Sequence, residues 1–410
     1  MATATIAMEV RKDAWVIGLI SLAHGFSHFF QLVLPPLFPL LVVDFGVSYQ
    51  ALGVVMMVFY GVSSLAQIGS GFLVDRFGAR RILIGGLIVF SGATALIGLV
   101  PSFYFLFPFA ILAGLGNSVF HPADFALLNA RVGSGRLGRA YGMHGIAGNI
   151  GWALAPPASV GLAALVGWRF ALVALGCVGI AAGLLLMTRD ELGERGPPAR
   201  ARVAAHEAHK LSDSLRLLTA KPILMCFAYF VLLSVSMVGL QTFEIPATMM
   251  LYDTSITVAT TALTGFLVGG SVGIFAGGFL ADRTTQHHLV AVAGILLASV
   301  GVAIIASGRI PVVSIVPILS LIGFALGATL PSRDLLVRQA TPAGASGRTY
   351  GFVYSGLDVG GAAVPILFGA LLDLRAPQWV FLVVCAAMLL SVATVLNMRP
   401  RSAPLPATGD

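Results

Sequence analysis

Charged side chains are scarce in this sequence of 410 residues. Asp, Glu, Lys and Arg together make up 10% of it, whereas an average soluble domain contains roughly 25%. So few charges cannot cover a surface that faces water, which excludes an ordinary soluble enzyme. Cysteine is also rare: Cys177, Cys226 and Cys385 all lie in apolar stretches, so no disulfide framework is expected. A GxxxxGK[ST] phosphate-binding loop is missing, which excludes an ATP-driven pump.

Apolar residues dominate instead. They account for 58% of the sequence, and stretches of about 20 of them recur, the length that a helix needs to cross a bilayer core of about 30 Å. Glycine is abundant, with 48 residues, which suits close packing of helices in lipid. The sequence therefore predicts an all-α membrane protein with twelve transmembrane helices. We expect them at residues 14–43, 50–75, 82–100, 103–131, 139–165, 168–188, 222–251, 257–281, 289–307, 311–338, 349–372 and 377–398.

The two halves of the chain repeat each other. Gly71-Phe-Leu-Val-Asp-Arg76 recurs as Gly278-Phe-Leu-Ala-Asp-Arg283, and further matching positions keep an offset of 207 to 211 residues. Duplicated halves related by an axis normal to the membrane occur in several transporter folds. We therefore predict two pseudo-symmetric six-helix bundles, at residues 1–188 and 222–400. A cytoplasmic linker would join them at 189–221, and a cytoplasmic tail would follow at 401–410.

Basic residues are distributed unevenly between the two sides of the expected membrane. Of the 24 Lys and Arg residues, 20 fall in segments on one side, three (Arg169, Arg309, Arg375) in loops on the other, and Arg333 within a helix. This asymmetry follows the positive-inside rule and places both termini in the cytoplasm. The net charge of +7 thus indicates topology rather than binding of nucleic acid. We expect a multi-pass protein of the cell inner membrane that acts as a monomer.

The loop after the second expected helix reads Gly71-x-x-x-Asp75-Arg76-x-Gly78-x-Arg80-Arg81. This motif resembles the signature that major facilitator carriers have between helices 2 and 3. The resemblance implies a cytoplasmic gate, in which Asp75 pairs with an arginine or a helix N-terminus. A role in topology alone is the alternative, because Arg80 and Arg81 would serve it. The residues assigned to the gate are Gly71, Asp75, Arg76, Gly78, Arg80, Arg81, Arg131, Asp282 and Arg283.

The first expected helix carries His24 and His28, followed by Gln31. Residues four apart share a helix face, and ionisable groups inside a membrane usually face a cavity. Since imidazole titrates near physiological pH, we interpret this face as a site for substrate or protons. The alternative is that both rings are neutral and only pack against neighbouring helices.

The fourth expected helix carries His121 and Asp124, three residues apart on one face, with Pro122 between them. Pro122 is predicted to kink the helix, because proline lacks the N–H that an interior position needs. We interpret His121 and Asp124 as a proton-handling pair. A buried hydrogen-bonded pair that fixes helix packing is the alternative.

The second half supplies Gln241 and Glu244 in the seventh helix, Arg333 in the tenth and Asp358 in the eleventh. An arginine that faces the cavity would indicate an anionic substrate, because guanidinium pairs with carboxylates through two hydrogen bonds. Pairing of Arg333 with Asp334 or Asp358 is an equally good interpretation, since intramembrane charges often pair with one another. Glu244 could form an external gate or a proton site, or reach the membrane interface.

Some first-half residues carry a closer resemblance. His24, Gln31, Pro39 and the triplet Phe120-His121-Pro122 are similar to those of the fosmidomycin-resistance branch of major facilitator exporters. The resemblance implies a central cavity lined by helices 1, 4, 7 and 10. The chain departs from the branch at His28, where the branch has an acidic residue, and at Ala123-Asp124, where it has glutamate. A different ligand is therefore expected.

These features predict a secondary carrier, not an enzyme, that works by alternating access and is coupled to protons. Export of a small organic molecule, such as an anion or a drug, is favoured, and import of an organic acid with protons is the alternative. A protein of another class remains open, because His24-x-x-x-His28 has the spacing of metal ligands and His121 could join them. Structural metal sites normally have four ligands, so we expect no bound metal and no cofactor.

Overall fold

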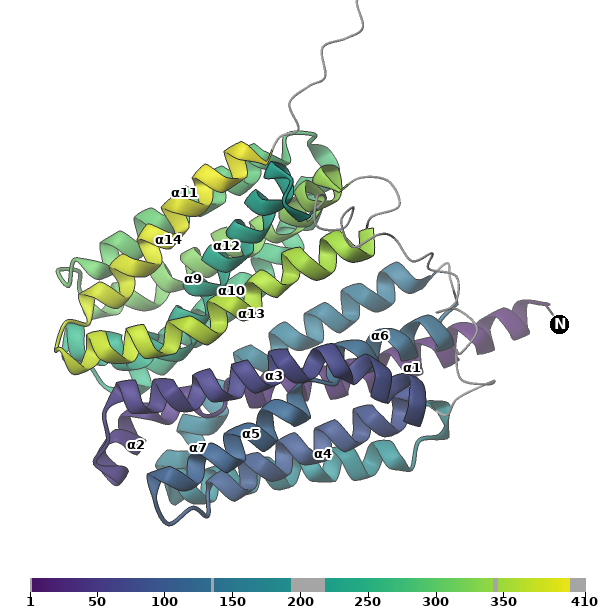
Figure 1. The fold of residues 1–410 in the computed structure, drawn as a ribbon, viewed down its shortest axis with the longest axis horizontal. Helices are drawn as coiled ribbons and strands as arrows, with labels where there is room; N and C mark the ends of the chain where they lie inside the picture. The colour runs from purple at the N-terminus through teal and green to yellow at the C-terminus, as the bar shows by residue number, and fades with distance from the viewer. Residues whose placement is uncertain (1, 134–135, 193–217, 342–345, 399–410) are drawn as a thin grey trace, which may run out of the picture.

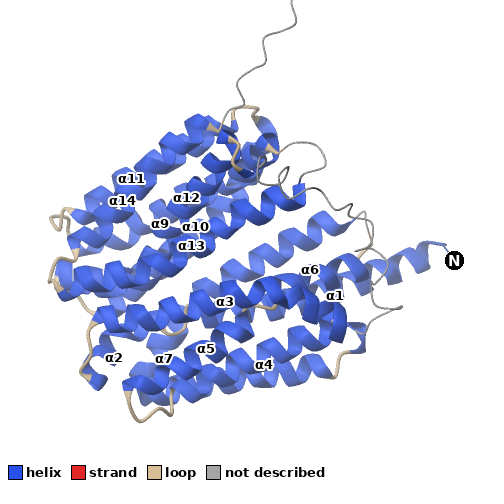
Figure 2. Cartoon of the chain, in the orientation of Figure 1, coloured by secondary structure: helices blue, strands red, loops and turns tan. Residues whose placement is uncertain are grey.

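The computed structural model describes residues 2–133, 136–192, 218–341 and 346–398. Within these ranges the regular structure consists of helices joined by loops, with no strand (Figure 2). Residues 193–217 of the expected linker and the whole expected tail at 401–410 lie outside the described residues. The two six-helix halves lie beside each other, as Figure 1 shows.

The first half begins with a long helix that carries the two histidines. Short 3-10 helices, named η, separate some of the longer helices. The elements of this half are α1 (Ala2–Gln31), η1 (Pro35–Leu37), α2 (Phe38–Phe45), α3 (Tyr49–Phe77), α4 (Ala79–Ile97), η2 (Phe103–Phe105), α5 (Leu106–Asn117), α6 (Phe120–Arg131), α7 (Leu137–Met187) and η4 (Asp190–Leu192).

The second half repeats several local details of the first half. Ser48 and Ser255 each accept a hydrogen bond from the N–H three residues later and so cap the helix that follows. A 3-10 turn precedes the fourth helix of each half. The elements of this half are α9 (Lys221–Tyr252), α10 (Ile256–Arg283), α11 (His287–Ala306), η6 (Val312–Ser314), α12 (Ile315–Ala340), α13 (Ser346–Asp373) and α14 (Gln378–Asn397).

Eleven helices in the described part are long and apolar enough to cross a membrane. One of them, α7, has 51 residues and would be about 75 Å long if straight, far more than one bilayer core. The chain turns at Gly167, where φ is 80° and ψ is 154°, outside the helical region. Glycine tolerates this positive φ without a steric penalty. The two arms of α7 correspond to the expected helices at 139–165 and 168–188, which confirms the twelve-helix fold.

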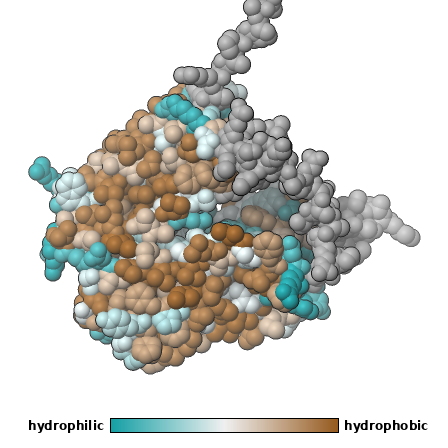
Figure 3. Space-filling model, viewed as in Figure 1, coloured by the Kyte–Doolittle hydropathy of each residue, from teal (hydrophilic) through white to brown (hydrophobic). Residues whose placement is uncertain are grey.

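Large apolar side chains are exposed around the outside of the bundle. Phe72, Ile68 and Leu165 are each more than 70% exposed, and apolar residues cover much of the face seen in Figure 3. In water, apolar patches of this size would drive association. In a bilayer they contact lipid, which confirms a multi-pass membrane protein.

The two halves pack against each other mainly through α3 with α13 and α7 with α10. We call the end of the bundle that holds Arg76, Arg80, Arg81, Arg131 and Arg283 the basic end. The other end, which holds Tyr49, Tyr104, Val313 and Asp373, is called the opposite end. Figure 3 shows a hollow between the two halves on the side of the basic end.

Glycines along α3 show where the halves touch. At the opposite end, a side chain at Gly53 would collide with the Pro365 carbonyl of α13. Toward the basic end, Gly61, Gly69 and Gly71 have no neighbouring atom within 4 Å of the position where a Cβ would stand. The halves are therefore in close contact at the opposite end and separate toward the basic end.

Candidate functional site

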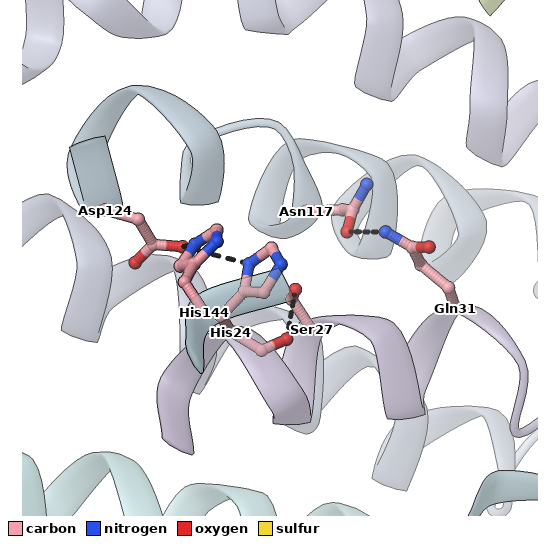
Figure 4. Close-up of polar contacts among 6 residues, drawn as sticks. All are labelled: His24, Ser27, Gln31, Asn117, Asp124 and His144. Atoms are coloured by element: carbon pink, nitrogen blue, oxygen red, sulfur yellow. Dashed lines mark hydrogen bonds and ion pairs between the residues drawn. The ribbon is translucent and has the colours of Figure 1, made fainter. Parts of the chain in front are cut away.

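Two histidine side chains from different helices meet at a buried carboxylate on a third helix. In Figure 4 the rings of His24 on α1 and His144 on α7 both point toward Asp124 on α6. Asp124 Oδ2 lies 3.1 Å from His24 Nδ1 and 3.0 Å from His144 Nε2. The two rings stack with their centroids 3.5 Å apart. All three residues are buried, and Asp124 is 0% exposed.

Small residues allow the helices to come close enough for this arrangement. The Cβ of an alanine in place of Gly148 would stand 2.8 Å from His28 Nδ1 and 3.0 Å from His24 Nε2, so only glycine leaves room for the rings. One turn later, Gly151 contacts the Gly25 carbonyl of α1, again with no space for a side chain. The glycines of α7 thus position the imidazoles of α1, as small residues do at helix contacts in membranes.

Two further imidazoles lie next to this group. His28 lies 4.4 Å from His24 and 4.2 Å from Trp152, measured between ring centroids. The His121 ring is 5.3 Å from His24 and stacks on Phe125. His121 is exposed, whereas Phe120 before it is buried. We call His24, His28, His121, Asp124 and His144 the histidine cluster, which runs from an accessible ring to a buried carboxylate.

Asp124 forms its hydrogen bonds with other helices, while its role with His121 in proton handling stays a prediction. The hydrogen-bond partners of Asp124 are His24 and His144, not its helix neighbour His121. The helix is interrupted between α5 and α6 just before Pro122, which confirms the predicted break. Because proline cannot donate, the Ser118 carbonyl loses its helical partner, and it accepts a hydrogen bond from Ser70 Oγ of α3 instead, at 3.0 Å.

Gln31 anchors a second polar network next to the cluster. Its amide donates to Asn117 Oδ1 at 2.9 Å, and Asn117 Nδ2 donates in turn to Ser63 Oγ at 2.8 Å. Trp152 Nε1 donates to Gln31 Oε1 at 3.2 Å. Since Trp152 also contacts the His28 ring, the network connects α3 and α5 to the cluster through α7. The amide nitrogen and the amide oxygen of Gln31 therefore each have a hydrogen-bond partner.

The second-half candidates are less concentrated. Arg333 donates from Nε to Asp334 Oδ1 at 2.9 Å and lies over the Phe230 ring, so the interpretation with an internal partner fits the geometry. Tyr354 donates to the same carboxylate oxygen. Glu244 is fully buried and accepts a hydrogen bond from Thr248 at 2.7 Å, while its Oε2 has no partner among the described residues.

Gln241 and Asp358, the remaining second-half candidates, do not belong to the Arg333–Asp334 ion pair. Gln241 is buried near Glu244 on α9, and its Nε2 also has no partner in the described part of the chain. Asp358 of α13 lies beside Ser64 of α3, at the interface of the two halves. The structure therefore does not bring the second-half residues into one compact group, as it does for the first half.

Three residues of the histidine cluster could hold a metal ion. One ligand atom each from His24, Asp124 and His144 lies within 4.8 Å of the other two. Three ligands leave one position of a tetrahedral site open. The set of His24, His28 and His121 that the sequence offered as an alternative metal site is not the one that the structure assembles.

The sequence matches the family model of the Major Facilitator Superfamily over residues 20–256 and 240–409. The chain belongs to the Major Facilitator Superfamily. It is similar to the fosmidomycin resistance protein of Escherichia coli (strain K12), with 26% identity over 288 residues, 69% of this chain and 68% of that protein. It is also 26% identical to the chloramphenicol resistance protein of Streptomyces lividans over 405 residues, 96% and 98% of the two chains.

Solved structures show the same fold. A bacterial homolog to the human lysosomal transporter Spinster, in an inward-facing and occupied conformation, superimposes with a TM-score of 0.75. The alignment covers 95% of this chain and 99% of that one, at 16% identity. The resemblance to major facilitator carriers, including a fosmidomycin resistance protein, is thus confirmed, and the protein is a transporter rather than an enzyme.

In this major facilitator protein no hydrogen bond or ion pair joins the signature motif to the other half among the described residues. Asp75 and Arg76 are exposed, and Asp75 makes no ion pair within the described ranges. Arg80 donates to the Met187 carbonyl at 2.6 Å, and Arg131 donates to the Glu191 carbonyl at 3.0 Å. Both arginines therefore fasten the end of α7 and η4 within the first half. Asp282 and Arg283 of the second copy are likewise exposed.

His144 belongs to the site, although sequence reasoning did not select it. A single histidine near the start of a helix is a weak signal. A stronger one was available, because His144 lies one helical turn before Gly148, within the glycine-rich stretch of the fifth helix. Residues four apart share a face, so the space that Gly148 provides and the His144 ring lie on the same side of α7.

Proposed function

We propose that this protein is a proton-coupled secondary carrier of a small organic molecule, with the histidine cluster as the proton site. The observation that carries the proposal is the buried carboxylate of Asp124, shared by imidazoles from two other helices. Its second oxygen, Oδ1, is buried and has no partner among the described residues. A buried polar atom without a partner calls for an explanation, and a proton that arrives and leaves supplies one.

Proton transfer at this point would act on three helices at once. The cluster joins α1, α6 and α7, and exposed His121, which lies next to His24, is proposed as the entry point of the proton toward the buried carboxylate. A change in charge on Asp124 alters its hydrogen bonds to His24 and His144, and so the relative stability of two packings of these helices. A ligand shifts such an equilibrium only through a difference in affinity between the states. We propose that Asp124 binds its proton with different affinity in the two packings.

We propose export as the direction. The support is the similarity to proteins named for resistance to fosmidomycin and chloramphenicol. An anionic substrate has less support than the sequence suggested, because the Arg333 guanidinium is bonded to Asp334. Import of an organic acid with protons remains the alternative. The basic end is proposed to face the cytoplasm of a bacterial cell, with both termini there, by the positive-inside rule.

Uptake into proteoliposomes tests coupling and direction together. Antiport predicts that labelled chloramphenicol or fosmidomycin accumulates when the interior is more acidic than the exterior, because protons leave as the solute enters. Symport predicts accumulation under the reverse gradient. Uptake that is the same under both gradients and with none would contradict proton coupling.

The three-ligand group at Asp124 favours one second candidate, a metal-binding membrane protein. Purified protein dialysed against Zn²⁺ and then analysed for metal content distinguishes the two. Stoichiometric Zn²⁺ that is lost when His144 is replaced by alanine would favour a metal site. The carrier proposal expects no stoichiometric metal.

The signature motif leads to a prediction about Asp75. Replacing Asp75 by asparagine will leave the fold intact, because the side chain is exposed in this conformation. It will lower the population of the conformer that is open at the opposite end, since Asp75 is proposed to hold the basic end closed in that conformer. Spin labels at Tyr104 and Val313, which are 77% and 81% exposed on different halves, report this opening as a longer distance. An unchanged distance distribution would remove Asp75 from the gate.

A further inference from the structure

A carboxylate from the second half caps a helix of the first half. Asp373, the last residue of α13, accepts hydrogen bonds from the backbone N–H groups of Tyr49 and Gln50. The distances are 2.8 Å to Oδ1 and 2.9 Å to Oδ2. Tyr49 and Gln50 are the first two residues of α3. Both oxygens of Asp373 are therefore used across the boundary between the halves.

Asp373 completes the set of partners for this helix start. The first four N–H groups of a helix have no partner within it. In α3, Ser48 provides two acceptors, its Oγ for Ala51 N at 3.1 Å and its carbonyl for Leu52 N at 3.3 Å. Asp373 takes the other two, and its negative charge stands at the positive end of the helix dipole. If α3 and α13 separated, both N–H groups would lose Asp373 as their acceptor and become exposed to water.

The surrounding backbone contacts are equally close. The Cβ of an alanine in place of Gly369 would lie 2.6 Å from the Gln50 Cα, and Gly53 meets the Pro365 carbonyl. These contacts and the Asp373 cap lie on the same pair of helices, α3 and α13. The contact thus consists of closely packed backbone that ends in a charged cap.

Comparison of the two halves shows that only α3 receives such a cap from the other half. The pseudo-symmetric position lies 207 to 211 residues earlier, at 162–166, and these residues are Leu, Ala, Ala, Leu and Val. No carboxylate is available there for the start of α10, which Ser255 caps from within its own half. A structural feature needed by the fold of each half would be expected in both copies.

We propose that Asp373 is a latch that holds the opposite end of the carrier closed. To open that end, Asp373 must release the N–H groups of Tyr49 and Gln50. When the carrier closes again, the carboxylate returns to them. The latch concerns the conformational equilibrium and requires only that the two halves move apart, so it deepens the proposed alternating access without depending on protons or on the identity of the substrate.

The test measures opening directly, without transport. The native cysteines, of which Cys177 is exposed, are replaced first, and spin labels are placed at Tyr104 and Val313. Asp373→Asn removes the charge and one acceptor. We expect the population with the longer distance to rise about fivefold, the factor that corresponds to the roughly 1 kcal/mol typical of a lost helix cap. Asp44→Asn is the matched control, because Asp44 pairs with Arg169 inside the same half.

A second pair of variants removes a donor instead of the acceptor. Tyr49→Pro deletes the N–H that Asp373 accepts, at the first helical position, where proline is well tolerated. Ser48 is already extended, with φ −82° and ψ 161°, as a residue before proline should be. Tyr49→Ala removes the same ring and keeps the N–H. If Asp373→Asn fails to fold, this pair still decides the question.

The outcomes separate clearly. Greater opening in Asp373→Asn and Tyr49→Pro, with Asp44→Asn and Tyr49→Ala unchanged, would support the latch. Distance distributions that stay the same in both latch variants, or that change equally in the controls, would overturn it. A carrier that opens as described but shows no response to a pH gradient would keep the latch and refute the proposed proton coupling.

Discussion

Replacement of Asp124 by asparagine will reduce gradient-driven accumulation of substrate to the level of liposomes without protein. Asparagine has the shape of aspartate and keeps one oxygen acceptor, but it can neither bind nor release a proton in the physiological range. His24 and His144 would retain a neighbour of the same size. The helices α1, α6 and α7 would remain packed, while the event that couples them to the proton gradient would be lost.

Two assays on the same preparation check this result. Accumulation under a pH gradient will disappear, whereas exchange of labelled for unlabelled substrate, which needs no net proton movement, will persist. Asp44→Asn, a carboxylate in a surface pair with Arg169, serves as the control and should keep both activities. Full accumulation by Asp124→Asn would show that another group carries the proton.

Replacement of Gly148 by alanine will have the second large effect. The new methyl group would stand 2.8 Å from His28 Nδ1 and 3.0 Å from His24 Nε2, closer than van der Waals contact allows. Forcing an extra carbon into a packed interior typically costs about 1–3 kcal/mol. We expect a lower thermal unfolding temperature and loss of gradient-driven accumulation, because the rings must move away from Asp124.

A matched glycine and a second-site change sharpen this prediction. Gly145 lies on the same helix with no neighbour within 4 Å, so Gly145→Ala should leave stability and transport unchanged. Adding His28→Ala to Gly148→Ala removes part of the clash and should restore stability. It should not restore accumulation, since His28→Ala alone is expected to abolish it without unfolding the protein. Equal loss of stability in the Gly145 and Gly148 variants would contradict the packing argument.

Most of the fold could be predicted from the sequence, because membrane helices leave strong local signals. Apolar stretches set the helices, and the repeat of Gly71–Arg76 at Gly278–Arg283 divided them into two bundles. The repeat extends to structural detail, as the caps at Ser48 and Ser255 show. Even the turn at Gly167 lies between two helices that the sequence separated correctly.

The site could be predicted only in part, because contacts between helices depend on rotation and depth. His24 and Asp124 were both selected, but the sequence could not place them together or add His144, which lies 120 residues after His24. Asp124 was assigned to His121 because the two share a helix face, whereas the neighbouring helices offered closer partners. Arg333 and Asp334 differ from this, because they are adjacent in the chain and pair with each other when the long arginine side chain folds back.

The Asp373 latch could not be read from the sequence for the same reason. Its acceptors and donors are 323 and 324 residues apart, and the donors are backbone groups with no signature of their own. The internal repeat would have marked Asp373 as a departure from symmetry, yet many unpaired positions depart from it. Only the contact between α3 and α13 gives this residue a role.

Proton release on substrate binding tests the central claim most directly. Purified carrier in weakly buffered detergent solution is mixed with saturating chloramphenicol or fosmidomycin while a pH-sensitive dye records free protons. If the histidine cluster exchanges its proton for substrate, the wild-type protein acidifies the solution and Asp124→Asn does not, although both bind the compound. Binding by the wild type without acidification, or equal acidification by the Asp124 variant, would contradict proton antiport through Asp124.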